Sequence, residues 1–309
     1  MDNSFIDKEI LNFKNLFLSF YQEKILIITT TLIFALFSVF YALSIVNKYS
    51  SEAKLISSLE LDSSSGNINL SNIDLGGLAN LVGGGRSNID SNPRTKLAKE
   101  LLTSKEFINQ FVKRRNILVP LMAGKSWNVE KNKININQKI YDERTESWQR
   151  ESTFLIGSAP SRDEVFNKFI SNFQIQRSKE GIFLISLISL SPLTSQQWLS
   201  WLIEDVNNEI RKKEVLLSEQ RISFLLNELK SERIASTKEA ISAVLKKEYT
   251  QLMLANTRED FVFTLIDPPS RASYRDGIPR SIICILITTL GFFFSLLIVI
   301  LKNYIKFFK

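Results

Sequence analysis

The chain of 309 residues carries a formal net charge of +7, and its mean hydropathy is near zero because two very apolar segments stand near opposite ends of a polar sequence. It contains no histidine, and its one cysteine, Cys284, lies in the second apolar segment. This composition excludes Ser-His-Asp and Cys-His catalytic sites and most zinc sites. Lys and Arg are scattered among 32 acidic residues, with 113–115 the only tight basic cluster of the polar region, so no nucleic-acid partner is expected.

The N-terminal part predicts a membrane protein. Residues 1–24 place Ile and Phe side chains on one side of a helix with charges interspersed, which is typical of a short amphipathic helix at a membrane surface. Residues 25–46 follow with 22 positions free of charge, and residues 281–301 give another 21. Each run can cross a hydrocarbon core of about 30 Å as a helix. The first run is longer than a signal-peptide core and lacks a small-residue cleavage site, so we expect it to be retained.

Two spans predict a hairpin through the membrane, with both ends of the chain on one side and residues 47–280 on the other. Residues 302–309 form a basic tail without acids. Short basic tails favour the cytoplasm, whereas long domains translocate largely regardless of charge. We therefore expect a bacterial inner-membrane protein with cytoplasmic ends and a large periplasmic domain.

The expected fold class is α+β, with a small mixed base made of residues 47–192 and 259–267. Alternating or apolar runs predict strands, and the segment 182–190 is apolar enough to be buried on both faces. Helical spacing predicts one helix that begins at Pro93 and a second that Ser161 caps. The expected strands are 49–59, 173–177, 182–190 and 260–266, and the expected helices are 93–115 and 163–172.

A stretch rich in Ser, Asn and Gly, residues 62–92, interrupts this base. Gly83, Gly84 and Gly85 precede Arg86 and Ser87, which is not the GxxxxGK[ST] order of a phosphate-binding loop. A flexible loop or a subunit-contact loop is the preferred interpretation.

The longest regular pattern lies at residues 195–258, which contain neither Gly nor Pro and repeat apolar residues at helical spacing. A single helix of this length would measure roughly 96 Å, whereas a compact domain of about 230 residues is only roughly 45 Å across. We therefore expect a very long helix that protrudes from the base. Its middle apolar stripe consists of Ile222, Leu225, Leu226 and Leu229.

The apolar stripes of this helix need partners, because a monomer with one straight helix would leave them exposed to water. The polar segment 230–239 interrupts the stripes, and a straight helix is least secure there. Two arrangements remain open. The helix folds back on itself as a hairpin, or it packs against the same helix of another subunit in a ring-like assembly, and both can hold at once.

Beyond the last strand the chain reaches Asp267, Pro268 and Pro269, and later Pro279. Proline fixes φ and removes an amide donor, so residues 267–280 are predicted to form a stiff, extended connector to the second span. The acidic residues of the long helix are spaced like a solvated face rather than like a catalytic pair. We expect no enzymatic activity, no cofactor and no metal site.

The order of these parts resembles the polysaccharide co-polymerases, specifically the chain length determinant (Wzz) family of O-antigen and related surface glycans. The resemblance covers nearly the whole chain, from the helix before the first span, through the glycine-rich loop, to the proline-containing segment before the second span. Two features depart from it: few prolines in the connector, and Gly291 as the lone glycine of the second span. The residues that carry the resemblance are Leu101, Leu102, Ser104, Phe107, Ser191, Pro192, Trp198, Asn207, Asn208, Ile266, Asp267, Pro268 and Pro269.

The resemblance implies a non-enzymatic protein whose periplasmic domain forms a homo-oligomer and sets how long a polymerase extends a lipid-linked glycan. Its expected partners are further copies of itself, the membrane-embedded O-antigen polymerase and the lipid-linked glycan. The connector residues Asp267, Pro268, Pro269 and Pro279 are candidates for contact with the polymerase. The candidates for subunit contact are Gly76, Gly77, Gly83, Gly84, Gly85, Asn207, Asn208, Ile222, Leu225, Leu226 and Leu229.

Three other functions compete with this one. A co-polymerase for capsule, enterobacterial common antigen or exopolysaccharide export would share this architecture, although the tail 302–309 leaves no room for the fused tyrosine kinase that such proteins often carry. A periplasmic ligand sensor would need a cytoplasmic output domain, for which neither end has room. A membrane-anchored structural tether would be favoured if cross-linking trapped only monomers.

Overall fold

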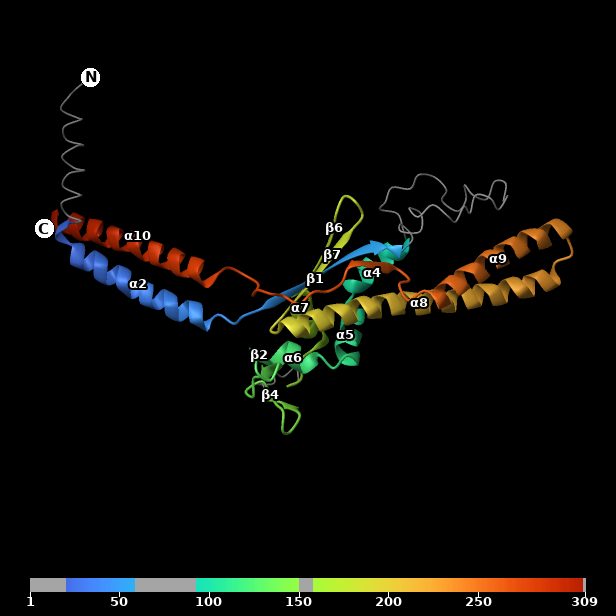
Figure 1. Ribbon diagram of the computed structural model, residues 1–309, viewed down its shortest axis with the longest axis horizontal. Coiled ribbons are helices and arrows are strands. Elements are labelled where there is room, and N and C mark those ends of the chain that lie inside the picture. The colour runs from blue at the N-terminus through green and yellow to red at the C-terminus, as the bar shows by residue number, and fades with distance from the viewer. Residues whose placement is uncertain (1–20, 59–92, 150–157, 308–309) are drawn as a thin grey trace, which may run out of the picture. The chain divides into compact units, whose positions relative to one another are not determined.

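The computed structural model describes residues 21–58, 93–149 and 158–307 (Figure 1). The chain forms two compact units. The first, which we call the terminal unit, comprises Met1–Asn47 and Asp276–Lys309, and the second, the central unit, comprises Lys48–Arg275. The predicted N-terminal amphipathic helix lies almost wholly outside the described residues, and so does the glycine-rich segment.

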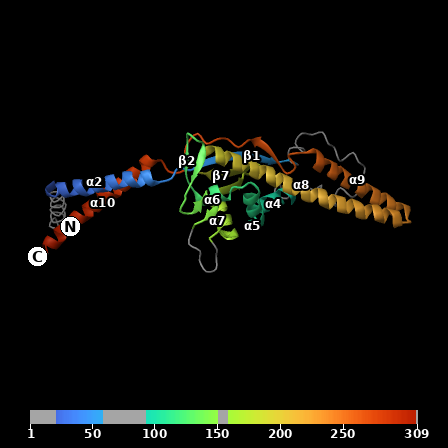
Figure 2. The same ribbon diagram turned by 90° about the horizontal axis from the view of Figure 1, so that it is seen from below.

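The terminal unit is a pair of helices, α2 at Lys24–Ser44 and α10 at Arg280–Phe307, which lie side by side (Figures 1 and 2). Within Lys24–Ser44 and Arg280–Lys302, stretches of 18 residues reach mean hydropathies of 2.3 and 2.8, and both helices are long enough to cross a membrane. They match the two predicted spans in position. In helices of this kind a buried hydroxyl must find a backbone acceptor, and Ser38 and Ser295 each donate to the carbonyl three residues earlier at 2.7 Å.

Gly291 of α10 lies closely against Phe34 of α2. A Cβ at this position would overlap Cβ and Cγ of Phe34. Because the hydrophobic effect does not drive helices together within lipid, they associate through close packing at small residues such as glycine. Each end of the pair also has a polar tie. Lys302 Nζ lies 2.6 Å from Glu23 Oε1, and Arg280 Nη2 donates to the Ile45 carbonyl at 3.1 Å.

We expect Gly291→Leu to separate α2 from α10, because overpacking an interface costs about 1–3 kcal/mol. Native Cys284 offers a readout, since its Sγ lies 3.8 Å from the Ser38 carbonyl oxygen. A Ser38→Cys variant should form a disulfide with Cys284, and adding Gly291→Leu should lower the yield. Thr289→Leu, which adds bulk at an exposed position, is the control. Equal yields in both backgrounds would contradict the packing role of Gly291.

The central unit is built on a four-stranded antiparallel sheet in the order β6-β7-β1-β8. The first strand of the unit therefore pairs with its last, and Ser57 stands opposite Phe263. Two small hairpins, β2 with β3 and β4 with β5, lie between residues 124 and 148. The strand bounds are β1 Tyr49–Ser57, β2 Gly124–Asn128, β3 Lys133–Ile136, β4 Tyr141–Asp142, β5 Ser147–Trp148, β6 Phe173–Arg177, β7 Phe183–Ser189 and β8 Phe263–Asp267.

One prediction about this sheet is wrong. The apolar run at β7 indicated burial on both faces, but burial alternates along the strand. Phe183, Ile185 and Leu187 are buried, whereas Leu184 and Ile188 on the other face are only half-buried. The physical reason is that the main hydrophobic cluster lies on one face of the sheet.

Four short helices complete the base: α4 Pro93–Leu102, α5 Lys105–Arg114, α6 Leu118–Ala123 and α7 Arg162–Ile170. The predicted helix over 93–115 is divided, because Ser104 adopts an extended conformation and begins α5 as its N-cap. The cap of α7 is confirmed. Ser161 Oγ accepts from the Glu164 amide at 3.2 Å, and the Glu164 carboxylate accepts from the Ser161 amide at 3.1 Å, which forms a capping box.

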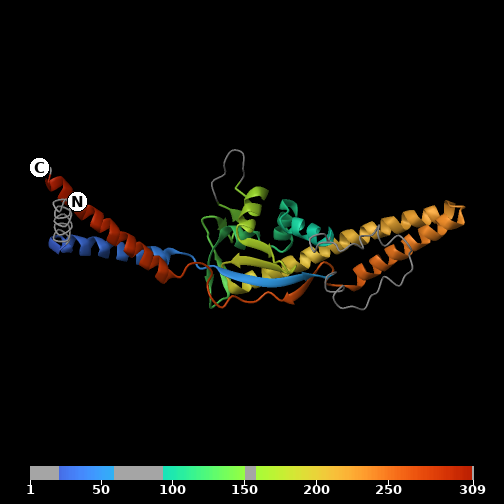
Figure 3. The ribbon, with the colours of Figure 1, turned by 90° about the horizontal axis from the view of Figure 1, so that it is seen from above.

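The prediction of one helix over 195–258 is also wrong. The chain forms α8 at Pro192–Ser231 and α9 at Ala235–Thr257, which lie alongside each other in Figures 1 to 3, so the hairpin alternative is confirmed. The turn falls within the polar segment 230–239. Glu232 and Ile234 have extended backbones there, and the Glu232 carboxylate accepts from the amides of Ile234 and Arg233, which lowers the pKa of Glu232.

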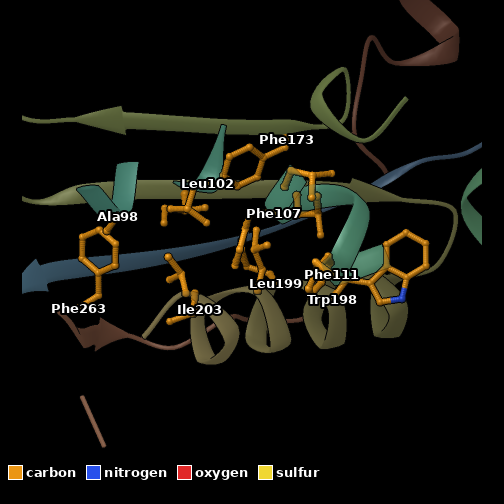
Figure 4. Packing of buried hydrophobic residues seen from close by; sticks show 14 of the residues in the cluster. Ala98, Leu102, Phe107, Phe111, Phe173, Trp198, Leu199, Ile203 and Phe263 are labelled. Carbon is orange, nitrogen blue, oxygen red and sulfur yellow. The ribbon is translucent and has the colours of Figure 1, made fainter. Parts of the chain in front are cut away.

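The inner half of α8 belongs to the core. Its residues Trp198, Leu199, Leu202, Ile203 and Val206 are buried against β1 and β7. Figure 4 shows Leu199 and Ile203 pointing into the same interior as Leu102, Phe107 and Phe173. After Ile210 the only buried residues of α8, which is described throughout, are Ser218 and Ile222. The outer half of α8 thus leaves the core and continues with α9 as its neighbour.

Two residues of the basic cluster at 113–115 form ion pairs with a buried acid of α8. Asp205 on α8 is buried, with a side chain 4% exposed, and Arg115 Nη2 lies 2.5 Å from its Oδ1. Arg114 Nε lies 3.7 Å from the other oxygen. A buried carboxylate needs such partners, and its hydrogen bond with Arg115 raises the pKa of Arg115. These ion pairs hold the end of α5 on α8.

Candidate functional site

Asn207 joins α8 to the strand that returns toward the second span. Its Nδ2 donates to the Phe263 carbonyl at 3.0 Å, and its Oδ1 accepts from the amides of Val262 and Phe263 at 3.1 and 2.9 Å. The residue is 4% exposed. Asn207 was a candidate for subunit contact, but its side chain is occupied inside its own chain, where it satisfies three backbone groups at the start of β8.

We expect Asn207→Ala to destabilise the central unit by about 3 kcal/mol, because it leaves buried amide and carbonyl groups of β8 without partners. Thermal unfolding of the full chain, followed by near-UV circular dichroism, measures the effect. Asn208→Ala at the next position is the matched control and should cost less than about 1 kcal/mol, since Asn208 is only half-buried. Equal effects of the two substitutions would contradict this role of Asn207.

Asn208 also acts within the chain. Its Oδ1 accepts from Arg211 Nη2 at 2.6 Å, and Arg211 Nη1 donates to the Arg258 carbonyl at 3.3 Å. Arg258 is the residue at which α9 ends. A cation at a helix C-terminus also opposes the negative end of the helix dipole. The Asn207-Asn208 pair therefore fixes both the end of α9 and the beginning of β8.

The predicted stripe of the outer helix forms the seam of the hairpin. Ile222 is 7% exposed, and Leu225, Leu226 and Leu229 are half-buried on the same side of α8. An ionic cluster flanks this seam. Arg221 Nε lies 2.9 Å from Glu248 Oε2 on α9, and Arg221 Nη2 lies 3.1 Å from Glu214 Oε1. The side chains of the predicted stripe are therefore covered by α9 of the same chain.

Other apolar residues of the hairpin are exposed among the residues that the structure describes. Leu217 is 47% exposed and Phe224 64% exposed, and because they are seven residues apart they share one side of α8. That side is opposite the seam of Ile222 and Leu229 by helical spacing. We call Leu217 and Phe224 the outer apolar pair. This pair was not among the residues predicted from the sequence, although its seven-residue spacing, offset from the main stripe, was a readable signal.

The connector residues do not form one site. Asp267 ends β8, Pro268 is exposed, and Pro269 is buried with its carbonyl accepting from Gln196 Nε2 on α8 at 2.9 Å. Ser51 Oγ of β1 donates to the Ser270 carbonyl at 2.8 Å. The first part of the connector is thus tied to the sheet and to α8. Pro279 belongs to the terminal unit.

The candidates Gly76, Gly77, Gly83, Gly84 and Gly85 lie outside the described residues. Within the described parts of the chain no cluster of three His, Cys, Asp or Glu residues has the arrangement of a metal site.

Comparison with known proteins confirms the resemblance that the order of segments indicated. Residues 9–114 match the family model described as "Wzz: Chain length determinant protein". This range runs from the N-terminal segment through α2, β1 and α4 to the end of α5. A comparison with curated proteins finds no match.

Solved structures with similarity to this chain bear related titles. A "full-length bacterial polysaccharide co-polymerase" is 13% identical, with 94% of this chain and 97% of that one covered at a TM-score of 0.38. A fragment of WzzB, a polysaccharide co-polymerase from Salmonella Typhimurium, is 12% identical, with 75% and 100% covered at a TM-score of 0.31. A mutant of a Shigella flexneri lipopolysaccharide O-antigen chain-length regulator is 12% identical, with 74% and 100% covered at 0.20. At these TM-scores the likenesses support no conclusion about the site.

Proposed function

We propose that this chain, whose residues 9–114 match the chain length determinant family, is a non-enzymatic regulator of O-antigen chain length that acts as an oligomeric scaffold beside a polymerase. The family match is the observation that carries the proposal. It is supported by two helices of spanning length that flank a central unit. The surfaces of the hairpin and of the connector fit a scaffold.

We place the protein in the inner membrane with cytoplasmic ends and a periplasmic central unit. Two apolar helices fit a membrane protein, and the basic tail favours the cytoplasm for the ends. In this arrangement β1 and β8, which are neighbours in the sheet, are the strands nearest in sequence to the two spans. The connector from Asp267 to Pro279 would then be available to a polymerase in the same membrane.

Self-association would proceed through the outer apolar pair. Leu217 and Phe224 are exposed on α8, whereas the stripe at Ile222 and Leu229 is used within the hairpin. Aromatic and aliphatic side chains that are exposed in the free subunit are typical anchors of subunit interfaces. A repeated contact of this kind between copies of one chain would close into a ring if its rotation permits.

Deleting the gene tests the function directly. The glycan length distribution on a gel should lose its preferred length, and the intact chain should restore it. Separate gels of lipopolysaccharide, enterobacterial common antigen and capsule from the same strain identify the glycan whose distribution changes. An unchanged length distribution in all three glycans would overturn the proposed function. A change confined to capsule would show instead that the protein is a co-polymerase for capsule.

We expect Leu217→Glu with Phe224→Glu to weaken self-association by about tenfold or more, since removing buried anchors typically costs about 2 kcal/mol each. The variant should remain folded because both side chains are exposed. Light scattering of the full chain in detergent measures its mass, and the gel measures glycan length. Ser242→Glu with Thr250→Glu, which adds the same charge at exposed polar positions of α9, is the control. A double variant with the wild-type mass would exclude this surface as the contact.

A further inference from the structure

A cavity in the base of the central unit is separate from the hairpin and from the connector. It lies where α6, α7, β7 and the beginning of α8 meet the residue that precedes β1, and its volume is about 80 Å³. A cavity can hold one water molecule once this volume reaches about 10–15 Å³. The cavity is therefore large enough for a small polyatomic group rather than for one water.

The wall of this cavity contains an unpaired buried hydroxyl. Ser189, the last residue of β7, is 7% exposed and lines the cavity. Its Oγ has no hydrogen-bond partner among the described residues. Buried hydroxyls are normally paired, and leaving one unpaired costs free energy. A polar guest in the cavity would supply the missing partner.

The charge around the cavity is of one sign. Lys48 and Lys168 line it, and no acidic residue does. Neither ammonium group forms an ion pair with the described residues, although other lysines of the chain, such as Lys105 with Asp163, are paired. Two cations with no acid between them raise the local potential and favour an anion.

The remaining lining residues indicate which kind of anion would fit the cavity. Asn172 contributes an amide whose Nδ2 also donates to the Lys168 carbonyl at 2.9 Å, and Leu121 and Trp198 form part of an apolar wall. Lysine ammonium groups and hydroxyls bind phosphate oxygens as donors. The apolar wall accommodates carbon atoms next to the charged group, which inorganic phosphate lacks.

We propose that this cavity is a binding site for the phosphate group of a phosphate ester, held by Lys48, Lys168 and Ser189. The proposal does not depend on the chain-length function. The ester could be soluble, such as a sugar phosphate, or a lipid headgroup. The lipid source belongs in the test because Lys48 follows Ser44, the last residue of α2, by four positions in the chain.

The test uses the full chain in a maltoside detergent, which contains no phosphate. One arm titrates glucose 1-phosphate, and the other titrates phosphatidylglycerol mixed into the micelles. Phosphorus NMR line broadening measures binding in both arms. Saturable binding of glucose 1-phosphate identifies a soluble ester, and binding of phosphatidylglycerol alone identifies a headgroup. No saturable binding in either arm overturns the proposal.

Variants locate the binding. Lys48→Gln with Lys168→Gln should raise the dissociation constant by about tenfold or more, since two charge-assisted contacts are lost. The control Lys246→Gln with Lys247→Gln removes the same charge from exposed positions of α9 and should change the constant by less than about twofold. Equal weakening by the two double variants would show general charge attraction and overturn the site.

Ser189→Ala separates the hydroxyl from the charges. Since its Oγ is unpaired within the described structure, the substitution should not lower the melting temperature, yet it should weaken binding several-fold. A variant that melts like the wild type and binds equally well would remove Ser189 from the site. If the lysine variants also bound like the wild type, the binding would lie outside this cavity and the proposal would be overturned.

Discussion

The pairing of β1 with β8 is the constraint on which the central unit depends. These strands are the first and the last of the unit, and Ser57 of β1 pairs with Phe263 of β8. Just beyond the strands, Ser58 Oγ donates to the Phe261 carbonyl at 2.8 Å across 203 positions of the chain. Closing so long a loop costs conformational entropy. The pairing persists because buried side chains, Leu55 and Phe263 among them, join one hydrophobic cluster, and because Asn207 satisfies the backbone at the start of β8.

Helix α8 has two roles along its length. Its inner half supplies the core with Trp198 and Leu202, while its outer half has α9 as its neighbour and exposes Phe224 to solvent. The residues of α8 that form the core are thus different from those that it exposes at its outer end. The scaffold proposed above would need this separation, because an interface that also held the fold would leave no folded monomer.

Pairs of polar side chains determine how several helices and strands of the central unit are positioned against one another. Asp205 places α5 on α8 through two arginines, Asn208 and Arg211 locate the end of α9, and Gln196 holds the Pro269 carbonyl. Burying such a group costs free energy unless it forms a hydrogen bond or an ion pair. An arrangement of the elements that left these groups unpaired would therefore be less stable. Ser189 departs from this pattern in the base, and its unpaired hydroxyl is the reason that its cavity is a candidate ligand site.

Features that depend on local chemistry were predictable from the order of the amino acids: the two spanning helices, the strands at β1 and β6, and the cap at Ser161. The composition likewise excluded histidine-based catalysis, and the polar interruption at 230–239 marked the weak point of the long helical pattern. That the chain reverses there became clear only from the folded structure, because an apolar stripe can be covered equally by α9 or by a second subunit and periodicity cannot distinguish the two. The roles of Asn207, Arg115 and Ser189 likewise became clear only from the folded structure. Their surroundings come from distant parts of the chain, and only the tertiary arrangement brings partners within hydrogen-bonding distance or leaves a group without one.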